Sequence, residues 1–242
     1  MKLALAQIRN MNGDLSRGWD RHLVMIRHAA QMGADQVYFP ELSLIGYEPT
    51  LAAQLAPRVE ALAWDDLDGL VDQHQLTVGL GAPWRTEQGL HIAMRIRQPQ
   101  QAPFWYSKQY LHQDEEAWFT AASWHPGAWG QAPRIGLAIC YEMSREAHLA
   151  ALLPEGIDIY LASVAKHEAG MQAAVVRLEQ VAKDHQIFTL IVNSLGPCDT
   201  FEAGGKSAIW GPGGRLLGQL DDAREGLLCL DTESMAVEHH YA

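Results

Sequence analysis

The sequence predicts a layered α/β fold, on three observations. Short apolar runs typical of strands alternate with longer segments in which apolar residues recur at helical spacing. Turn residues such as glycine, proline, asparagine and aspartate separate these segments. No linker, low-complexity tract or internal repeat interrupts the 242 residues, so we expect residues 1–242 to form a single domain.

The first part of the chain alternates strand and helix. The apolar run at 2–8 predicts a strand, and the segment 19–30, which is followed by Gly33, predicts a helix. Residues 36–39 predict a second strand that ends at Pro40. The same criteria then predict a helix at 57–73, a strand at 76–82 and two neighbouring strands within 90–106.

The second part continues the alternation and closes with strands alone. The expected elements are a strand at 134–139, a helix at 144–153, a strand at 157–163, a helix at 171–185 and a strand at 187–193. Three further strands are expected at 206–210, 215–220 and 226–231, with a Gly-Pro-Gly-Gly turn at 211–214.

Composition and charge exclude several classes of function. The formal net charge of −11, with no dense run of basic residues, argues against nucleic acid as a partner. No signal peptide and no apolar window of roughly 18 residues is visible, which predicts a cytoplasmic protein without a membrane partner. The three cysteines form no CxxC pair, and no HExxH motif occurs. We therefore expect neither a disulfide framework nor a bound metal.

Reactive side chains follow three of the predicted strands. Open α/β sheets place reactive groups just beyond the carboxyl ends of their strands. Glu41 follows the strand that ends at Pro40, Lys108 follows the strand near residue 106, and Cys140 follows the strand at 134–139. A carboxylate, an amine and a thiol at three strand ends form a plausible nucleophilic site.

The chemistry of such a set is coherent. A free thiol with a pKa of about 8.5 is only a few per cent thiolate at neutral pH, and a nearby base or cation raises that fraction. Glu41 could accept the proton of Cys140. Lys108 and a backbone N–H just after Cys140 would stabilise the oxyanion of a tetrahedral intermediate, each donor contributing roughly 3 kcal/mol.

Each of these residues also has a purely structural interpretation. A cysteine at the end of an apolar strand is often a small core residue. Glu41 could be a surface carboxylate or a charge at a helix N-terminus. Lys108 is one of only five lysines, but scarcity does not make a residue catalytic. Residue patterns alone leave both interpretations open.

Three longer segments carry a family resemblance. Residues 39–47 (FPELSLIGY), 106–111 (YSKQYL) and 135–142 (IGLAICYE) resemble the signature segments of the nitrilase superfamily, the carbon–nitrogen hydrolases, in order and spacing. The resemblance extends over nearly the whole chain, because the first strand and the segments around 192–194 and 205–207 are similar as well.

The resemblance implies a four-layer α-β-β-α sandwich that usually pairs into a homodimer. It implies Glu41 as general base, Lys108 as the cation that stabilises the oxyanion, and Cys140 as the nucleophile. The family pattern of glutamate, two residues and two aromatics fits Glu115, which would be a further catalytic residue. The alternative for Glu115 is a solvated acidic turn.

The implied reaction is cleavage of a non-peptide carbon–nitrogen bond. We expect a cofactor-independent hydrolase of a small linear amide (an ω-amide, a carbamoyl compound or an aliphatic amide) acting through a cysteine thioester. Tyr141, Glu142, Arg145 and Trp118 are the expected substrate-binding residues, with Arg145 placed to hold a substrate carboxylate. The alternatives are a surface salt bridge for Arg145 and packing for Trp118. Nitrile hydrolysis by the same triad and a non-catalytic binding protein are the competing functions.

Overall fold

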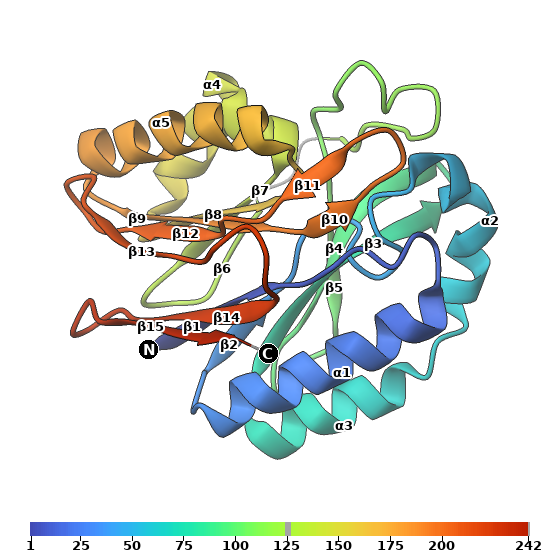
Figure 1. Ribbon diagram of the computed structural model, residues 1–242, viewed down its shortest axis with the longest axis horizontal. Helices are drawn as coiled ribbons and strands as arrows, with labels where there is room; N and C mark the ends of the chain where they lie inside the picture. The colour runs from blue at the N-terminus through green and yellow to red at the C-terminus, as the bar shows by residue number, and fades with distance from the viewer. Residues whose placement is uncertain (124–126, 242) are drawn as a thin grey trace.

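Two large β-sheets face each other, with helices on the outer side of each (Figure 1). This arrangement is seen in a computed structural model that describes residues 1–123 and 127–241. The four layers confirm the expected α-β-β-α sandwich. None of the helices in the described part of the chain is long and apolar enough to cross a bilayer.

The first sheet has seven strands in the order β15-β14-β1-β2-β3-β4-β5. Strands β1, β2 and β3 run parallel, and the remaining neighbours are antiparallel. The strands are β1 (Lys2–Gln7), β2 (Gln36–Tyr38), β3 (Thr77–Thr86), β4 (Gly89–Arg97), β5 (Phe104–Ser107), β14 (Gly226–Asp231) and β15 (Val237–Tyr241).

The second sheet has six strands in the order β13-β12-β9-β8-β7-β6. Its central strands β7, β8 and β9 are parallel and almost wholly buried. The strands are β6 (Ala128–Trp129), β7 (Ile135–Ile139), β8 (Ile159–Val164), β9 (Phe188–Asn193), β12 (Ala208–Trp210) and β13 (Leu216–Gln219). A separate two-stranded sheet pairs β10 (Leu195–Pro197) with β11 (Glu202–Gly204).

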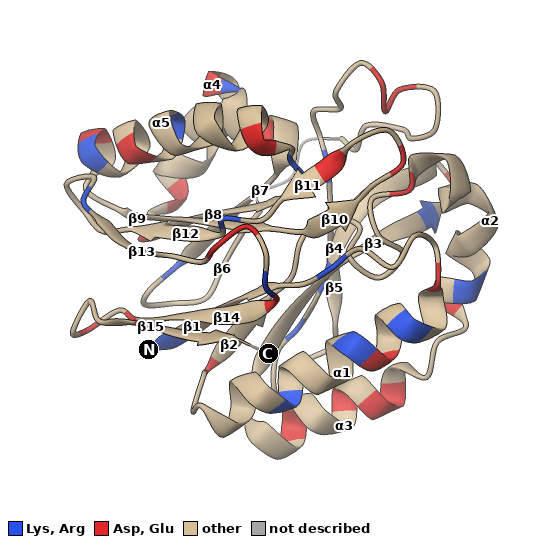
Figure 2. Ribbon diagram, viewed as in Figure 1, with Lys and Arg blue, Asp and Glu red and all other residues tan. Residues whose placement is uncertain are grey.

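The helices divide between the two sheets, and charged residues lie along their length (Figure 2). Helices α1–α3 flank the first sheet, and α4 and α5 cover the second (Figure 1). Asp14 caps α1 by accepting a hydrogen bond from the N–H of Arg17. The helices are α1 (Leu15–Gln31), α2 (Pro49–Glu60), α3 (Trp64–His74), η1 (Cys140–Ser144), α4 (Glu146–Leu152), η2 (Leu153–Glu155) and α5 (Glu168–His185).

One predicted helix is wrong in extent. The single helix expected at 57–73 is two helices, because α2 begins at Pro49 and a break at residues 61–63 separates it from α3. Proline favours the first helical turn. Pro49 holds that position, and Pro57 lies within α2.

Four strands were not predicted from the sequence. Strands β6, β10 and β11 have two or three residues each, too few to show an alternating pattern. Strand β15 pairs with β14 through its backbone, but four of its five side chains are exposed and show no apolar alternation. These strands lie at sheet edges or outside the two large sheets.

The interface between the two sheets is apolar and is held by a few polar links. The largest buried cluster includes Leu5 and Val37 of the first sheet and Leu137 and Leu161 of the second. Ser163 of β8 donates a hydrogen bond to the carbonyl of Phe39 at 2.9 Å. This link ties the second sheet to the chain segment that carries Glu41.

Glycine is required where that segment crosses β3. A Cβ atom added at Gly81 would lie 2.2 Å from the carbonyl oxygen of Pro40 and 2.6 Å from the nitrogen of Leu42. Both are backbone atoms, so they could not rotate away. The absence of a side chain at Gly81 therefore fixes how closely the loop bearing Glu41 approaches the sheet.

Candidate active site

The three strand ends singled out in the sequence meet between the two sheets. Glu41 follows β2 and Lys108 follows β5, both in the first sheet, whereas Cys140 follows β7 in the second. The side chains of Glu41 and Lys108 are fully buried, and Cys140 is partly exposed. The site therefore forms only where the two sheets are packed together.

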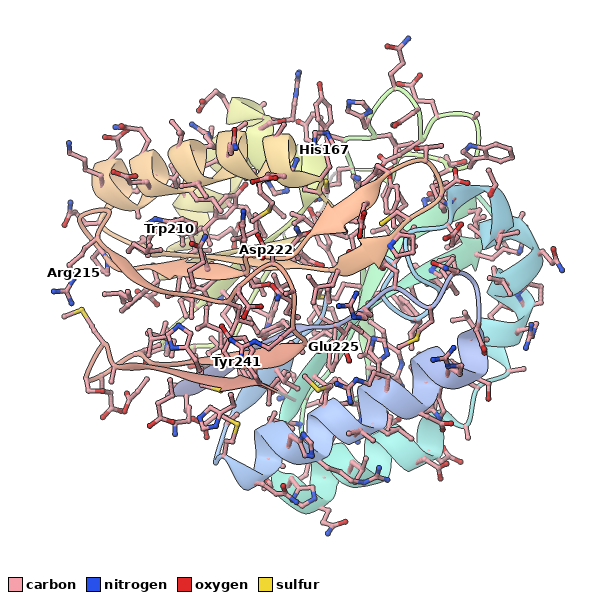
Figure 3. All side chains as sticks on the ribbon, in the orientation of Figure 1. His167, Trp210, Arg215, Asp222, Glu225 and Tyr241 are labelled. Carbon is pink, nitrogen blue, oxygen red and sulfur yellow. The ribbon has the colours of Figure 1, made fainter. Side chains whose placement is uncertain are left out.

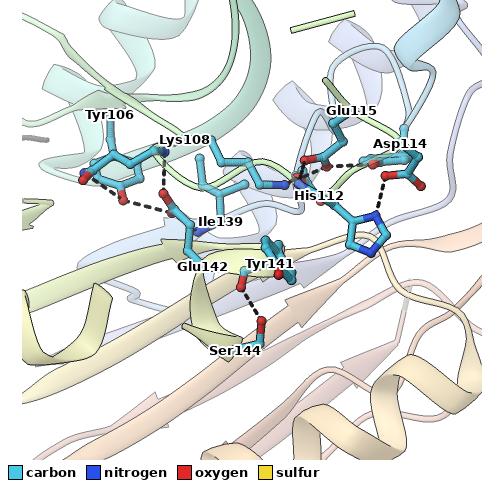
Figure 4. A network of polar contacts seen from close by, with 12 residues as sticks. Tyr106, Lys108, His112, Asp114, Glu115, Ile139, Tyr141, Glu142 and Ser144 are labelled. Atoms are coloured by element: carbon cyan, nitrogen blue, oxygen red, sulfur yellow. Dashed lines mark hydrogen bonds and ion pairs between the residues drawn. The ribbon is translucent and has the colours of Figure 1, made fainter. Parts of the chain in front are cut away.

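The ammonium of Lys108 bridges two carboxylates. Its Nζ atom donates a hydrogen bond to Oε1 of Glu41 at 2.6 Å and another to Oε1 of Glu115 at 2.7 Å. Glu115 is itself held by the hydroxyl of Tyr47 at 2.8 Å. It also accepts a hydrogen bond from the backbone N–H of His112 at 2.8 Å (Figure 4). Glu115 is 1% exposed, which excludes the alternative of a solvated acidic turn.

Two residues of the site have left-handed backbone conformations. Cys140 has a φ of +46° at the junction of β7 and η1, and Leu42, next to Glu41, has a φ of +51°. Such conformations cost a residue with a side chain about 1–3 kcal/mol, and they persist only where the surrounding packing imposes them. The turn at Cys140 brings the thiol to the end of the sheet.

A buried carboxylate fixes this turn. One oxygen of Glu142 accepts hydrogen bonds from the N–H of Ile139 at 2.7 Å and from the hydroxyl of Tyr106 at 2.9 Å. The other accepts one from the N–H of Gln109 at 2.6 Å (Figure 4). Glu142 thus joins the residue before Cys140 to the residue after Lys108.

Burial and charge set the protonation of the site. Burial raises the pKa of Glu41 to about 6, although attraction to Lys108 partly opposes this effect. Burial disfavours the ammonium of Lys108, but attraction to Glu41 and Glu115 outweighs it and raises the pKa of Lys108. Burial also raises the pKa of the Cys140 thiol to about 12. The resting nucleophile is therefore a neutral thiol that needs a base.

Glu41 has a carboxylate oxygen available for that purpose. Among the described residues, its buried Oε2 atom has no hydrogen-bond partner that meets normal geometric limits. The thiol of Cys140 is nevertheless near enough to lower the pKa of Glu41 as a hydrogen-bond donor. An unpaired buried oxygen is costly, and a proton arriving from the thiol would satisfy it.

Cys140 opens into a small pocket with a volume of about 170 Å³. Glu115 and Tyr141 contribute to its wall, as does the turn between β8 and α5 (His167, at the start of α5, is labelled in Figure 3). The residues that line it are Tyr47, His112, Asp114, Glu115, Cys140, Tyr141, Ala165, Lys166, His167, Gly170 and Phe201. In the described part of the chain, no cluster of three or more histidine, cysteine or acidic side chains is arranged to hold a metal ion.

Of the four expected substrate-binding residues, only Tyr141 lines the Cys140 pocket. Glu142 is fully buried with both oxygens bonded inside the protein, so it supports the turn rather than facing a substrate. Arg145 lines a neighbouring hollow and contacts the rings of Tyr110 and Tyr141. Trp118 is 46% exposed and lies outside the pocket wall.

Sequence reasoning missed several residues of the pocket. Tyr47 is the last residue of the motif at 39–47, and its position there was the available signal. Lys166 and His167 follow the predicted strand at 157–163, so the search of strand ends could have found them. Phe201 lies in a connection that showed no pattern.

Sequence comparison shows the family. The family model for the carbon-nitrogen hydrolases matches residues 2–238, and the chain belongs to this family. The chain is similar to an (R)-stereoselective amidase from a Pseudomonas species, with 27% identity over 222 residues that cover 90% of this chain and 80% of the relative. The protein is accordingly a carbon–nitrogen hydrolase.

Solved structures show the same fold. An amidase of the nitrilase superfamily from Nesterenkonia AN1, solved as a cysteine-to-serine mutant, superposes with a TM-score of 0.87 at 24% identity, covering 96% of this chain and 91% of that chain. A cysteine-to-alanine mutant of the Nesterenkonia sp. AN1 amidase, in complex with butyramide, superposes with a TM-score of 0.86 at 24% identity, covering 96% and 90% of the two chains.

Proposed function

We propose that this amidase hydrolyses small linear carboxamides through a thioester on Cys140. The observation that carries the proposal is the arrangement of Glu41, whose carboxylate lies beside the Cys140 thiol with one oxygen held by Lys108 and the other unbonded. Base, nucleophile and cation are thus in place together before a substrate arrives.

The first half of the reaction acylates the cysteine. Glu41 takes the thiol proton as the sulfur of Cys140 attacks the amide carbon, and the carbonyl oxygen becomes an oxyanion. Lys108 uses two of its three N–H donors on carboxylates, so the third can stabilise the oxyanion. The backbone N–H of Tyr141, in the first turn of η1, supplies a second donor. Collapse of the intermediate breaks the C–N bond, and Glu41 returns the proton to the departing amine.

The second half releases the acid. Glu41, again a carboxylate, removes a proton from a water molecule that attacks the thioester carbon. The same donors stabilise the second oxyanion, and its collapse breaks the C–S bond. The thiolate of Cys140 then regains its proton from Glu41. Glu115 holds Lys108 in place through both halves, since the two are joined at 2.7 Å.

The size of the pocket supports a small substrate. A volume of about 170 Å³ accommodates an acyl chain of a few carbon atoms but not a drug-sized molecule. The butyramide bound to the Nesterenkonia relative is of this size. The homodimer implied by the family resemblance stays a prediction.

Ammonia release from a panel of compounds tests the proposal. We expect turnover of acetamide, propionamide, butyramide, ω-amides and N-carbamoyl amino acids to reveal at least one good substrate, and the matching nitriles to react more slowly. Enzyme alkylated with iodoacetamide serves as the blank. Faster turnover of nitriles would favour the nitrilase alternative, and ammonia release unaffected by alkylation would contradict a cysteine mechanism.

The activity is expected to rise with pH through about 6. Glu41 acts as a base only when ionised, and burial raises its pKa to about 6, so protonation removes the base as the pH falls below that value. Measuring kcat/KM from pH 4.5 to 8 tests this, and the rate should fall about tenfold per pH unit well below 6.

The alkylation rate of Cys140 identifies the group responsible. We expect the rate of reaction with iodoacetamide to show the same acid limb in the wild type and to lose it in Glu41→Gln. If the alkylation rate of Glu41→Gln still falls at low pH, another carboxyl group is responsible for the fall. Glu142, whose pKa burial raises to about 7, would then be the group to replace next.

A further inference from the structure

Lys166 is a cation in the active-site pocket that the proposed chemistry does not use. It lies in the turn between β8 and α5 and lines the pocket together with Cys140 and Glu115. The side chain of Asn193 binds both its backbone N–H, at 2.9 Å, and its carbonyl, at 3.0 Å. Gly204 donates a further hydrogen bond to that carbonyl at 2.9 Å. The backbone that carries Lys166 is therefore fixed.

The ammonium of Lys166 has no ion-pair or hydrogen-bond partner among the described residues. Three other lysines form ion pairs with carboxylates, namely Lys2, Lys108 and Lys206. Lys183 also lacks one, but it is exposed on the last turn of α5. Lys166 differs from Lys183 because it is half-buried in the pocket beside the nucleophile.

The acidic residues of the pocket are already engaged elsewhere. Glu115 accepts hydrogen bonds from Lys108, Tyr47 and the N–H of His112. Asp114 contacts the imidazole of His112 at 2.5 Å. Neither carboxylate is paired with Lys166, so its ammonium is free to interact with a bound molecule.

We propose that Lys166 binds a carboxylate on the substrate. The substrate class is then an amide that carries a carboxylate at its far end, such as the monoamide of a short dicarboxylic acid. The amide carbon would lie at Cys140 and the carboxylate at Lys166, both within one pocket of about 170 Å³. This inference rests on the proposed amidase function and assigns its specificity.

Lys166 replaces Arg145 as the candidate for this role. The guanidinium of Arg145 packs against Tyr110 and Tyr141 in the adjoining hollow, and Arg145 is absent from the wall of the Cys140 pocket. A substrate that fits in the Cys140 pocket can contact Lys166 inside this pocket, whereas contact with Arg145 would require it to extend into the adjoining hollow.

Paired substrates that differ only in charge test the inference. Succinamate and 4-oxopentanamide have the same length, but a carboxylate oxygen in the first is a methyl group in the second. We expect wild-type enzyme to prefer succinamate. Lys166→Met should lower kcat/KM for succinamate about 10- to 100-fold, mainly through KM, and change that for 4-oxopentanamide less than about twofold. The malonamate and glutaramate pairs extend the test to other chain lengths.

Three control variants sharpen the result. Lys183→Met removes an exposed lysine from the last turn of α5, the helix that follows Lys166, and should leave the preference unchanged. Arg145→Met removes the competing cation and should also leave it unchanged. Lys166→Glu reverses the charge and should favour 4-aminobutanamide, whose ammonium replaces the carboxylate. Retained turnover of 4-oxopentanamide shows that each variant is folded.

Several outcomes would overturn the inference while leaving the amidase function intact. One is a wild-type enzyme that hydrolyses both members of every pair at equal rates. Another is loss of the preference in Arg145→Met rather than in Lys166→Met. A third is an equal fall in kcat/KM for charged and neutral amides in Lys166→Met. This result would mean that Lys166 increases the reactivity of Cys140 rather than binding the substrate carboxylate. If no amide of any kind is hydrolysed, the proposed function itself fails.

Discussion

Replacement of Cys140 with alanine is expected to reduce amide hydrolysis by roughly five orders of magnitude, to the background rate. The alanine cannot form a thioester, and the variant keeps a base in Glu41 and a cation in Lys108 but has no nucleophile for the amide carbon. Ammonia release measured with the best substrate of the panel checks this. The fold should persist, since Cys140 is only partly buried and packs at the margin of the core, where it lines the pocket.

The two remaining cysteines provide the matched control. Cys198 and Cys229 are 7% and 1% exposed, and burial raises the pKa of each thiol to about 12. We expect iodoacetamide to label Cys140 alone in the native protein, as read by mass spectrometry of peptides, and Cys229→Ala to keep its activity. Residual amidase activity in Cys140→Ala above one per cent would refute the thioester mechanism.

The second large effect is expected from Lys108→Met. Loss of the ammonium leaves Glu41 and Glu115 as two buried carboxylates without a counter-charge. Removing one partner of a buried ion pair destabilises a protein by about 3–5 kcal/mol. The variant should also lose at least about 1,000-fold in kcat/KM, because the oxyanion loses its charged donor.

The stability effect has a definite pH dependence. Lys108 opposes the rise that burial causes in the pKa of Glu41, so without Lys108 that pKa rises further. The folded variant then binds more protons than the unfolded chain, and its deficit grows as the pH increases. Urea unfolding should show a larger loss at pH 8 than at pH 5. The double variant Lys108→Met/Glu115→Gln removes one of the stranded charges and should recover part of the stability at pH 8. A deficit that is equal at both pH values would contradict this account.

The sequence predicted the candidate catalytic residues because their geometry follows from strand ends. Glu41, Lys108 and Cys140 each come directly after a strand, and the packing of two sheets brings those ends together without help from a loop. Glu115 could be found only through the family resemblance, since nothing local distinguishes it from its neighbour Glu116. The structure separates the two, as Glu115 is buried and Glu116 is exposed.

The orientation of the other side chains of the site could not be predicted from the sequence. Glu142 and Arg145 both follow Cys140 closely, but η1 turns the first inward to the N–H of Ile139 and leaves the second outside the pocket. Lys166 reaches the pocket because Asn193 holds its backbone from another strand. Contacts of this kind join residues far apart in the chain, and no local pattern predicts them.

The division of the site between two sheets has a consequence for the chain before it is fully folded. Glu41 and Lys108 belong to one sheet and Cys140 to the other. A nascent or heat-loosened chain in which the sheets have separated therefore carries an ordinary cysteine with no base beside it. Such a chain would neither consume amides nor capture an acyl group that it could not release. The enzyme is therefore active only after the two sheets have packed together. The rate at which iodoacetamide labels Cys140 could be used to follow this packing during folding.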